Sequence, residues 1–234
     1  MIDPAPAHAR GLFVTATDTE VGKTFVAGAI LAALTARGEN AAPFKPVVTG
    51  IDEPVPDHPA DHELLAAAAA AADTERVTPY RFGPAVSPHL AAEEHGTPID
   101  PGVLVVAARN AGAQADALIV EGVGGLLVPL RDTYLVRDFA LMLGLPLIIA
   151  ARPGLGTINH TLLTIEAARS VGLAVCAVVI TPWPEHPTAM QRSNLETIEC
   201  LGEVEVATLA RAEHATPAAL ARVGQALPLD RWLA

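Results

Sequence analysis

The sequence predicts an α/β fold in which helices cover both faces of a doubly wound, mostly parallel sheet. Short apolar runs alternate with longer segments of helical periodicity along the chain. The apolar runs are continuous rather than alternating, as expected for strands that are buried on both faces. Hydrophobic residues make up 51% of the 234 residues and aromatic residues only 4%, so the core should be aliphatic. We expect one domain over residues 1–234, with residues 1–10 flexible.

Six strands are expected along the chain. Each is a run of aliphatic and β-branched residues that ends beside turn-forming or polar residues. Helical segments separate successive runs, which favours parallel pairing because each connection must cross the sheet. The expected strands cover residues 11–15, 42–47, 117–120, 145–150, 174–180 and 204–209.

The helical segments follow these strands in alternation. Residues 66–72 form a run of alanines, which we interpret as helix because alanine has the highest helix propensity. The loops that follow the carboxyl ends of the strands should form the ligand crevice. The expected helices cover residues 23–35, 62–72, 103–113, 136–143, 158–171, 189–201 and 217–226.

The charge of the chain limits its partners. The formal net charge is −11, which argues against a nucleic-acid or anionic-membrane surface. A site for a polyanion must therefore be a local positive pocket. Residues 1–10 show no apolar signal region and no stretch is long enough to span a bilayer, so we expect a cytoplasmic protein. Cys176 and Cys200 have no metal-type spacing and should be reduced thiols.

Residues 16–24, Ala-Thr-Asp-Thr-Glu-Val-Gly-Lys-Thr, join the first strand to the first helix in the manner of a phosphate-binding loop. Backbone N–H groups at the start of a helix hold phosphates, the lysine neutralises β- and γ-phosphate charge, and the hydroxyl binds Mg²⁺. The pattern has Gly where this chain has Ala16. The alternative is a Gly-Lys-Thr helix start without nucleotide. The residues expected to contact the nucleotide are Glu20, Val21, Gly22, Lys23, Thr24 and Phe25.

Two acidic residues are candidates for the same metal site. Glu121 ends an expected strand and precedes Gly122, Val123 and Gly124, which would let the backbone approach phosphates. The alternative for Glu121 is a solvated acid in a glycine turn. Asp61 precedes an expected helix, and the residues leave open whether it is an N-cap or a second Mg²⁺ ligand.

The chain contains only two lysines, Lys23 and Lys45, whereas arginine supplies the other positive charges. Pro46 cannot donate a hydrogen bond, so the chain should leave the sheet after Lys45, at the same edge as the phosphate loop. Lysine is a compact charge on a flexible stem, unlike the rigid arginine fork.

Residues 154–161 are a further candidate binding segment, because they form an expected helix start that could bind an anion. The alternative is an ordinary helix capped by Thr157 or Asn159.

Five segments together resemble the dethiobiotin synthetase family. They occur in the order of that family and extend to about Thr181. Lys-Pro-Val and Ile-Asn-His are unusual outside it. The matching segments are residues 17–24, 45–50, 87–92, 121–125 and 156–160.

The resemblance implies an ATP- and Mg²⁺-dependent ring closure. A 7,8-diaminononanoate amine takes up CO₂ as a carbamate, ATP phosphorylates the carbamate, and the second amine closes the cyclic urea. Lys23 and Lys45 would hold the phosphates and the carbamate. Thr19 and Thr49 would contact the diamine or carbamate. The implied Mg²⁺ ligands are Thr24, Asp61 and Glu121.

The family also implies a homodimer in which Gly156, Thr157 and Asn159 of the neighbouring subunit bind the substrate's carboxylate. One departure concerns the base of the nucleotide. The family often carries Asn-Asp where this chain has Thr181 and Pro182, and these residues offer fewer hydrogen bonds. We expect relaxed base selectivity, so that nucleoside triphosphates other than ATP compete.

Three other functions share the phosphate loop. A cobyrinate-type amide ligase would carry a glutaminase domain with a nucleophilic cysteine, and neither cysteine lies in such a setting. A non-catalytic nucleotide switch would carry a further lysine early in the loop, where residues 16–18 provide none. A small-molecule kinase needs the same loop and stays open.

Overall fold

The structure is a computed structural model that describes residues 10–53, 59–71, 73–212 and 214–234. A six-stranded sheet runs through it in the order β10-β9-β8-β1-β5-β2, with every neighbouring pair parallel. All six strands occur where the sequence predicts them, with ends that differ by a few residues. Their bounds are β1 Gly11–Ala16, β2 Ala41–Phe44, β5 Ala117–Gly125, β8 Leu147–Ala151, β9 Val175–Trp183 and β10 Glu205–Ala210.

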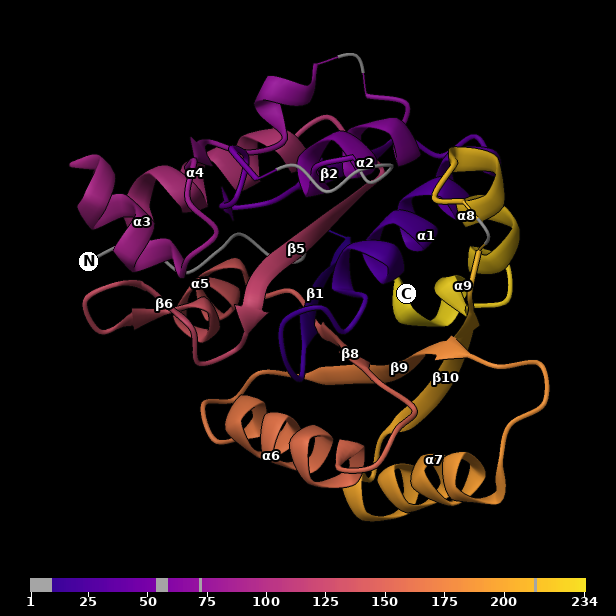
Figure 1. Ribbon diagram of the computed structural model, residues 1–234. Helices are drawn as coiled ribbons and strands as arrows, with labels where there is room; N and C mark the ends of the chain where they lie inside the picture. Colours follow the sequence, from indigo (N-terminus) through magenta and orange to yellow (C-terminus); the bar gives the residue numbers. More distant parts are fainter. Residues whose placement is uncertain (1–9, 54–58, 72, 213) are drawn as a thin grey trace.

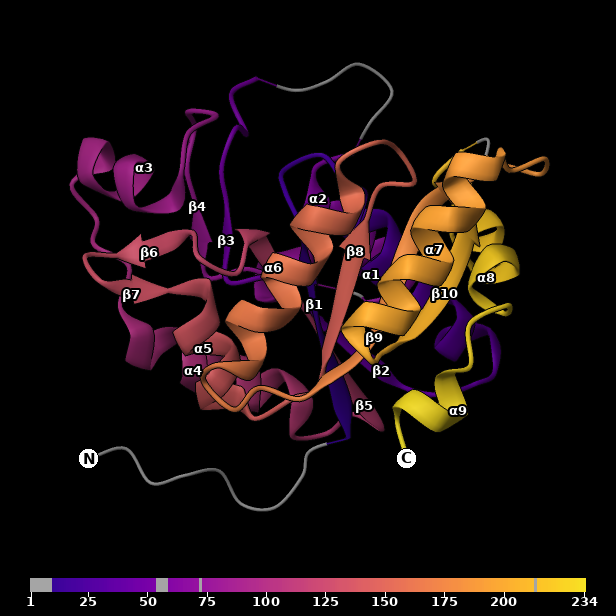
Figure 2. The same cartoon turned by 90° about the horizontal axis from the view of Figure 1, so that it is seen from below.

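Helices cover both faces of this sheet. Figure 1 shows α1 and α8 on one side of the strands and α6 and α7 on the other, and Figure 2 shows α6 and α7 side by side across the sheet. The helices are α1 Lys23–Ala36, α2 Asp61–Ala68, α3 Pro88–His95, α4 Pro101–Gly112, α5 Val136–Leu143, α6 Thr157–Arg169, α7 Ala189–Gly202, α8 Pro217–Gly224 and α9 Leu229–Trp232, with a 3₁₀ turn at Thr74–Arg76.

The central strand β1 shows how a continuous apolar run serves two cores. Leu12 and Val14 pack with residues of α1, α2, α8 and α9. Phe13 points to the other face and packs with α4 and α5. Neighbouring side chains of a strand point to opposite faces, so both must be apolar when both faces are covered. Among the described residues, no helix combines the length and apolarity needed to cross a membrane.

The predicted strand 42–47 is divided in two. β2 ends at Phe44, and a separate two-residue strand, Val47–Val48, pairs in parallel with Tyr80–Arg81. The backbone N–H of Lys45 donates to Val77 O at 2.8 Å instead of to the sheet. Pro46 has no N–H to donate, so the ladder stops there. The division leaves Lys45 at the carboxyl end of β2, as the sequence predicts.

The alanine run ends its helix earlier than predicted. α2 ends at Ala68, and Ala70 adopts a positive φ of 51°. The N–H of Ala71 donates to Ala66 O at 2.9 Å, a bond of the kind that ends a helix at a residue in the left-handed conformation. Helix propensities of most residues differ by only about a few tenths of a kcal/mol. Tertiary contacts can therefore end a helix within a run of alanines. Position 72 lies outside the described residues.

Several short elements were not predicted from sequence. They are helices α3 and α9, the 3₁₀ turn, the pair β3 and β4, and an antiparallel pair, β6 Pro129–Arg131 with β7 Tyr134–Leu135. All except α3 are too short to show a hydrophobic period, and α3 follows a Pro/Gly-rich stretch in a segment with little apolar periodicity.

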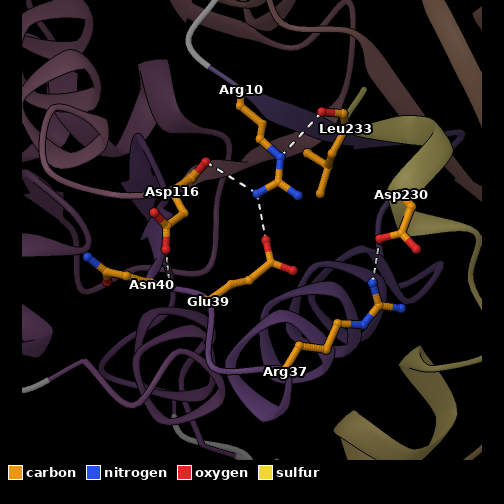
Figure 3. Close-up of polar contacts among 7 residues, drawn as sticks. All are labelled: Arg10, Arg37, Glu39, Asn40, Asp116, Asp230 and Leu233. Carbon is orange, nitrogen blue, oxygen red and sulfur yellow. Dashed lines mark hydrogen bonds and ion pairs between the residues drawn. The ribbon is translucent and has the colours of Figure 1, made fainter.

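Arg10, directly before β1, and Leu233, near the last helix, meet at the end of the sheet where β1 begins. Figure 3 shows the polar contacts around them. Arg10 Nε donates to Leu233 O at 3.3 Å, and Arg10 Nη1 donates to Glu39 Oε2 at 2.6 Å and to Asp116 O at 3.4 Å. Asp116 also accepts a hydrogen bond from the backbone of Asn40 at 2.8 Å. Residues 1–10 were expected to be flexible. Residues 1–9 lie outside the described residues, and Arg10 is held by the contacts given above.

Replacing Arg10 should weaken this junction. We expect Arg10→Met to lower the free energy of unfolding by about 1 kcal/mol, because its hydrogen bonds are only partly buried. Urea unfolding at neutral pH measures the change. Arg76→Met is a matched control, because its ion pair with Asp73 leaves the arginine side chain 88% exposed, and it should change stability by less than about 0.3 kcal/mol. Equal losses in the two variants would contradict a structural role for Arg10.

Candidate active site

The segment between β1 and α1 has the backbone of a phosphate-binding loop. α1 begins at Lys23 directly after Gly22, whose φ is 101°, and Glu20 has a φ of 57°. Ala16 is buried at the end of β1, pairs with Ala150 and Gly125, and does not have a positive φ. The Ala16 departure from the usual glycine therefore introduces no backbone strain.

Three charged side chains from separate elements meet beside this loop. Lys45 Nζ lies 2.6 Å from Asp61 Oδ2, at the start of α2, and 2.6 Å from Glu121 Oε1, in β5. Lys45 is 2% exposed and Glu121 is fully buried. The sequence predicted Lys45 and Glu121 beside the phosphate loop and left the role of Asp61 open, and the structure brings all three into one cluster.

The phosphate loop joins the same cluster through two residues of α1. Thr24 Oγ1 lies 2.9 Å from Asp61 Oδ1 and 2.9 Å from Glu121 Oε1. Lys23 Nζ lies 3.4 Å from the same Glu121 oxygen. All five polar side chains thus form one network around Glu121.

Burial and neighbouring charges shift the pKa values of Asp61, Lys45 and Lys23 in different directions. Burial by itself would raise the pKa of Asp61, but the Lys45 ammonium outweighs it and lowers the pKa to about 2. Burial would likewise lower the pKa of Lys45, but Asp61 and Glu121 raise it above its ordinary value. Lys23 differs, because burial is the larger effect there and lowers its pKa although Glu121 opposes the change.

Two details of the acidic residues differ from the sequence prediction. Asp61 is the first residue of α2 and not its N-cap, which is Ala60; Glu63 accepts the hydrogen bond from the Ala60 N–H at 3.0 Å. The Asp61 carboxylate is thereby left for Lys45 and Thr24. Glu121 lies within β5 and not at its end, because the strand continues to Gly125, which pairs with Ala16. Glu121 is therefore not a solvated acid in a turn.

The network has the donor chemistry of a magnesium site. Oε2 of Glu121 is buried with no hydrogen-bond partner. Mg²⁺ prefers hydroxyl and carboxylate oxygens, usually one or two carboxylates together with phosphates and water. Among the described residues, no three His, Cys, Asp or Glu side chains gather as a metal cage, which leaves the two carboxylates and Thr24 as the available set.

The remaining residues predicted around the nucleotide lie at the same edge. A Cβ at Gly124, whose φ is 57°, would lie 3.9 Å from Thr19 Oγ1, so the predicted loop threonine faces the glycine segment. A Cβ at Gly22 would lie 3.0 Å from Thr181 Cγ2. Thr181 is buried against the phosphate loop, whereas Pro182 is exposed. Val21 is buried, Phe25 packs partly buried against the core, and Gly122 is buried in β5 beside Val123.

The residues predicted to bind the substrate fall into two places. Thr49 follows β3, next to Gly50, whose N–H donates to Pro84 O at 2.9 Å. The 156–160 segment starts α6, where Gly156 has a φ of 91° and no side chain caps the helix. The prediction of a Thr157 or Asn159 cap is therefore wrong. Thr157 is buried near Thr161, and Asn159 is exposed.

A cavity of about 400 Å³ opens between the start of α6, the phosphate loop and the end of β9. Arg152 and His160 line it and were not predicted from sequence. Arg152 Nη2 lies 3.1 Å from Asp18 Oδ2, which ties the loop before α6 to the phosphate loop. The Arg-Pro pair after a predicted strand was the only signal for this contact. The cavity is lined by Thr17, Arg152, Pro153, Gly154, Leu155, Thr157, His160 and Pro182.

Comparison with known proteins identifies the family. A family model described as an AAA domain matches residues 10–214. An ATP-dependent dethiobiotin synthetase BioD of an Anaeromyxobacter species is 44% identical over 172 residues, 73% of this chain and 76% of that protein. The same synthetase of Aromatoleum aromaticum is 39% identical over 225 residues, covering 94% of this chain and 97% of that protein. This chain belongs to the dethiobiotin synthetase family.

Solved structures confirm the P-loop NTPase-type fold of this dethiobiotin synthetase family member. A chain of the MinC:MinD cell division protein complex of Aquifex aeolicus has a TM-score of 0.59 at 13% identity, covering 92% of this chain and 94% of that one. A ParA family ATPase of Chlorobium tepidum has a TM-score of 0.54 at 13% identity, covering 94% and 92%. Such low identity shows a common fold alone.

The contribution of Asp61 to stability should depend on pH. Its pKa in the folded protein is about 2, below the ordinary value of an aspartate, so its ion pair stabilises the fold fully above about pH 4 and is lost as the pH falls towards 2. We expect wild type to lose stability more steeply than Asp61→Asn over this interval, measured by urea unfolding at each pH. Asp230→Asn, whose side chain is 89% exposed, should follow the wild-type curve. Parallel curves for wild type and Asp61→Asn would contradict the assignment.

Proposed function

We propose that the network around Glu121 carries out ATP-dependent ring closure of 7,8-diaminononanoate with CO₂ to dethiobiotin, the ligase reaction of biotin biosynthesis. The observation that carries this proposal is the meeting of Lys23 and Lys45 beside one phosphate-binding loop. Family membership supports the reaction, because the relatives are ATP-dependent dethiobiotin synthetases. We place the reaction in the cytoplasm, where ATP is available and where the free thiols Cys176 and Cys200 would stay reduced.

The reaction proceeds in three steps. One amine adds to CO₂ and loses a proton to give a carbamate. A carbamate oxygen attacks the γ-phosphorus of ATP, which releases ADP and leaves a carbamic-phosphoric anhydride. The second amine then attacks the carbamate carbon, expels phosphate, loses a proton and closes the five-membered urea. Both intermediates, the carbamate and the anhydride, are anionic. The site must therefore supply fixed positive charges that stabilise them in place of water.

The side chains divide this task. Lys23, at the start of α1, would contact the phosphates and the carbamate. Lys45 enters from the end of β2 and would hold the carbamate and the developing charge of the anhydride. The hydroxyls of Thr19 and Thr49 would orient the amines. Lysine suits these roles because its ammonium is compact and its stem can follow the moving charge.

Thr24, Asp61 and Glu121 would hold a Mg²⁺ ion together with the nucleotide phosphates. When bound, the ion neutralises phosphate charge during phosphoryl transfer. The unpartnered Oε2 of Glu121 supports this assignment, because a buried carboxylate oxygen without a partner is costly unless a ligand satisfies it.

We further propose a homodimer in which the start of α6 reaches the site of the other subunit. Gly156, Thr157 and Asn159 would bind the substrate's carboxylate with backbone N–H groups at the positive end of this 13-residue helix. Leu155 beside them is 92% exposed, which fits a contact surface. Sedimentation that gives a monomer under assay conditions would contradict this part of the proposal.

The reaction can be tested directly. Protein, ATP, MgCl₂, bicarbonate and 7,8-diaminononanoate should give dethiobiotin, detected by mass, with one phosphate released per urea formed. Omitting the diamine should abolish phosphate release. Phosphate release that ignores the diamine, or a phosphorylated diamine without the urea, would refute the proposal and favour a nucleotide switch or a kinase.

Base selectivity should be weak. Thr181 packs against the phosphate loop and Pro182 has no N–H, so neither residue offers the amide that would recognise adenine. We expect kcat/KM for ATP to exceed that for CTP or GTP by less than about 100-fold, roughly 2.7 kcal/mol. Steady-state rates with each triphosphate at equal Mg²⁺ measure this ratio. A larger preference would show that other groups recognise the base.

A further inference from the structure

Lys45 holds the carboxylates that a divalent cation would need. Its Nζ lies 2.6 Å from Asp61 Oδ2 and 2.6 Å from Glu121 Oε1. Thr24 Oγ1 lies 2.9 Å from Asp61 Oδ1 and from the same Oε1. Only Oε2 of Glu121 has no partner among the four carboxylate oxygens. A cation held by these three side chains could take Oε2 of Glu121, but at Asp61 it must take an oxygen that Lys45 or Thr24 already contacts.

The charges of the network already balance. Two carboxylates, Asp61 and Glu121, face two ammonium groups, Lys45 and Lys23, and the second lies 3.4 Å from Glu121 Oε1. A free divalent cation entering this site would meet two like charges without any uncompensated negative charge. Lys45 and Glu121 are buried, although the Asp61 side chain is 43% exposed, so solvent screens the repulsion from Lys45 only in part. Nucleotide phosphates would bring the negative charge that is missing.

We infer that Lys45 is an internal competitor of the divalent cation. It keeps the carboxylate pair closed to the free ion and is displaced when the ion arrives with nucleotide phosphates. The inference rests on the proposed magnesium site and assigns Lys45 a second role, since the displaced ammonium becomes available to the anionic substrate. The ion would then bind only together with nucleotide phosphates. The Lys45 ammonium would become available to the anionic substrate only after the ion has bound.

The local structure allows this exchange without movement of the backbone. Lys45 N donates to Val77 O at 2.8 Å, which fixes the main chain, while the four-carbon stem can turn. Asp61 lies at the first turn of α2, and Glu121 is held within β5. Both carboxylates thus stand on backbone of regular structure, and we expect the lysine side chain to be the part that moves.

The first test measures binding of Mn²⁺, with no nucleotide added, from the electron paramagnetic resonance signal of the free ion. We expect Lys45→Met to bind Mn²⁺ at least about ten-fold more tightly than wild type, because the competing ammonium is gone. Lys23→Met is the matched control, since its Nζ lies farther from Glu121 Oε1, at 3.4 Å, and should give a smaller gain. Dissociation constants for wild type and Lys45→Met that agree within about two-fold would overturn the inference.

The second test measures coupling between metal and nucleotide. ADP should tighten Mn²⁺ binding in wild type by a larger factor than in Lys45→Met, because only wild type must first displace the lysine. Equal factors would overturn the inference. These readouts need neither diamine nor turnover, so they can fail while dethiobiotin still forms, and they can succeed if the proposed reaction fails.

A third test uses wild-type protein and stands even if Lys45→Met does not fold. The chain has only two lysines, so lysine labelled with ¹³C at Cε gives two resonances, which Lys23→Arg assigns. Mg²⁺ with ADP should shift the Lys45 resonance, whereas Mg²⁺ alone at the same concentration should leave it in place. A Lys45 resonance that moves with Mg²⁺ alone, or that does not move with Mg²⁺ and ADP, would contradict the exchange.

Discussion

The site depends on one constraint, which is that Glu121 of β5 carries a fully buried carboxyl group at the carboxyl rim of the sheet. An ionised acid in such a place must be paired, and removing one partner of a buried ion pair typically costs about 3–5 kcal/mol. Its partners come from two elements: Lys23 and Thr24 from α1, and Lys45 from the end of β2. Thr24 also lies 2.9 Å from Asp61 of α2. The contacts that hold the candidate site together are thus also contacts that hold this edge of the fold together.

The parallel sheet makes this convergence possible. β1 lies between β8 and β5, and β2 follows at the edge, so the carboxyl ends of these strands deliver the phosphate loop, Glu121 and Lys45 to one rim. The opposite rim carries the junction of Arg10 with Leu233 and Glu39. Structural and reactive polar contacts therefore occupy different ends of the strands, as the ligand sites of doubly wound folds do.

The sequence predicted the strands and most helices because buried parallel strands leave long apolar runs. It also predicted the residues around Glu121, since a lysine or an acid after such a run must lie at the carboxyl rim. It did not predict the early end of α2, where the tertiary structure outweighs the helix propensity of alanine. It also did not predict that Ala60, and not Asp61, is the N-cap residue of this helix. The Arg152 and Asp18 pair was missed because both residues lie in loops and the only signal was an arginine after a predicted strand.

The scarcity of lysine has a consequence for the chemistry of the surface. Both lysines belong to the site, with Lys23 9% and Lys45 2% exposed, and the outer charge of the fold is arginine and carboxylate. Acylating reagents and amine-directed cross-linkers therefore find no lysine amine on the outside of the molecule. A nucleotide analogue that carries an aldehyde or activated ester would have only site lysines within reach, so covalent labelling of a lysine would itself report on occupancy of the active site.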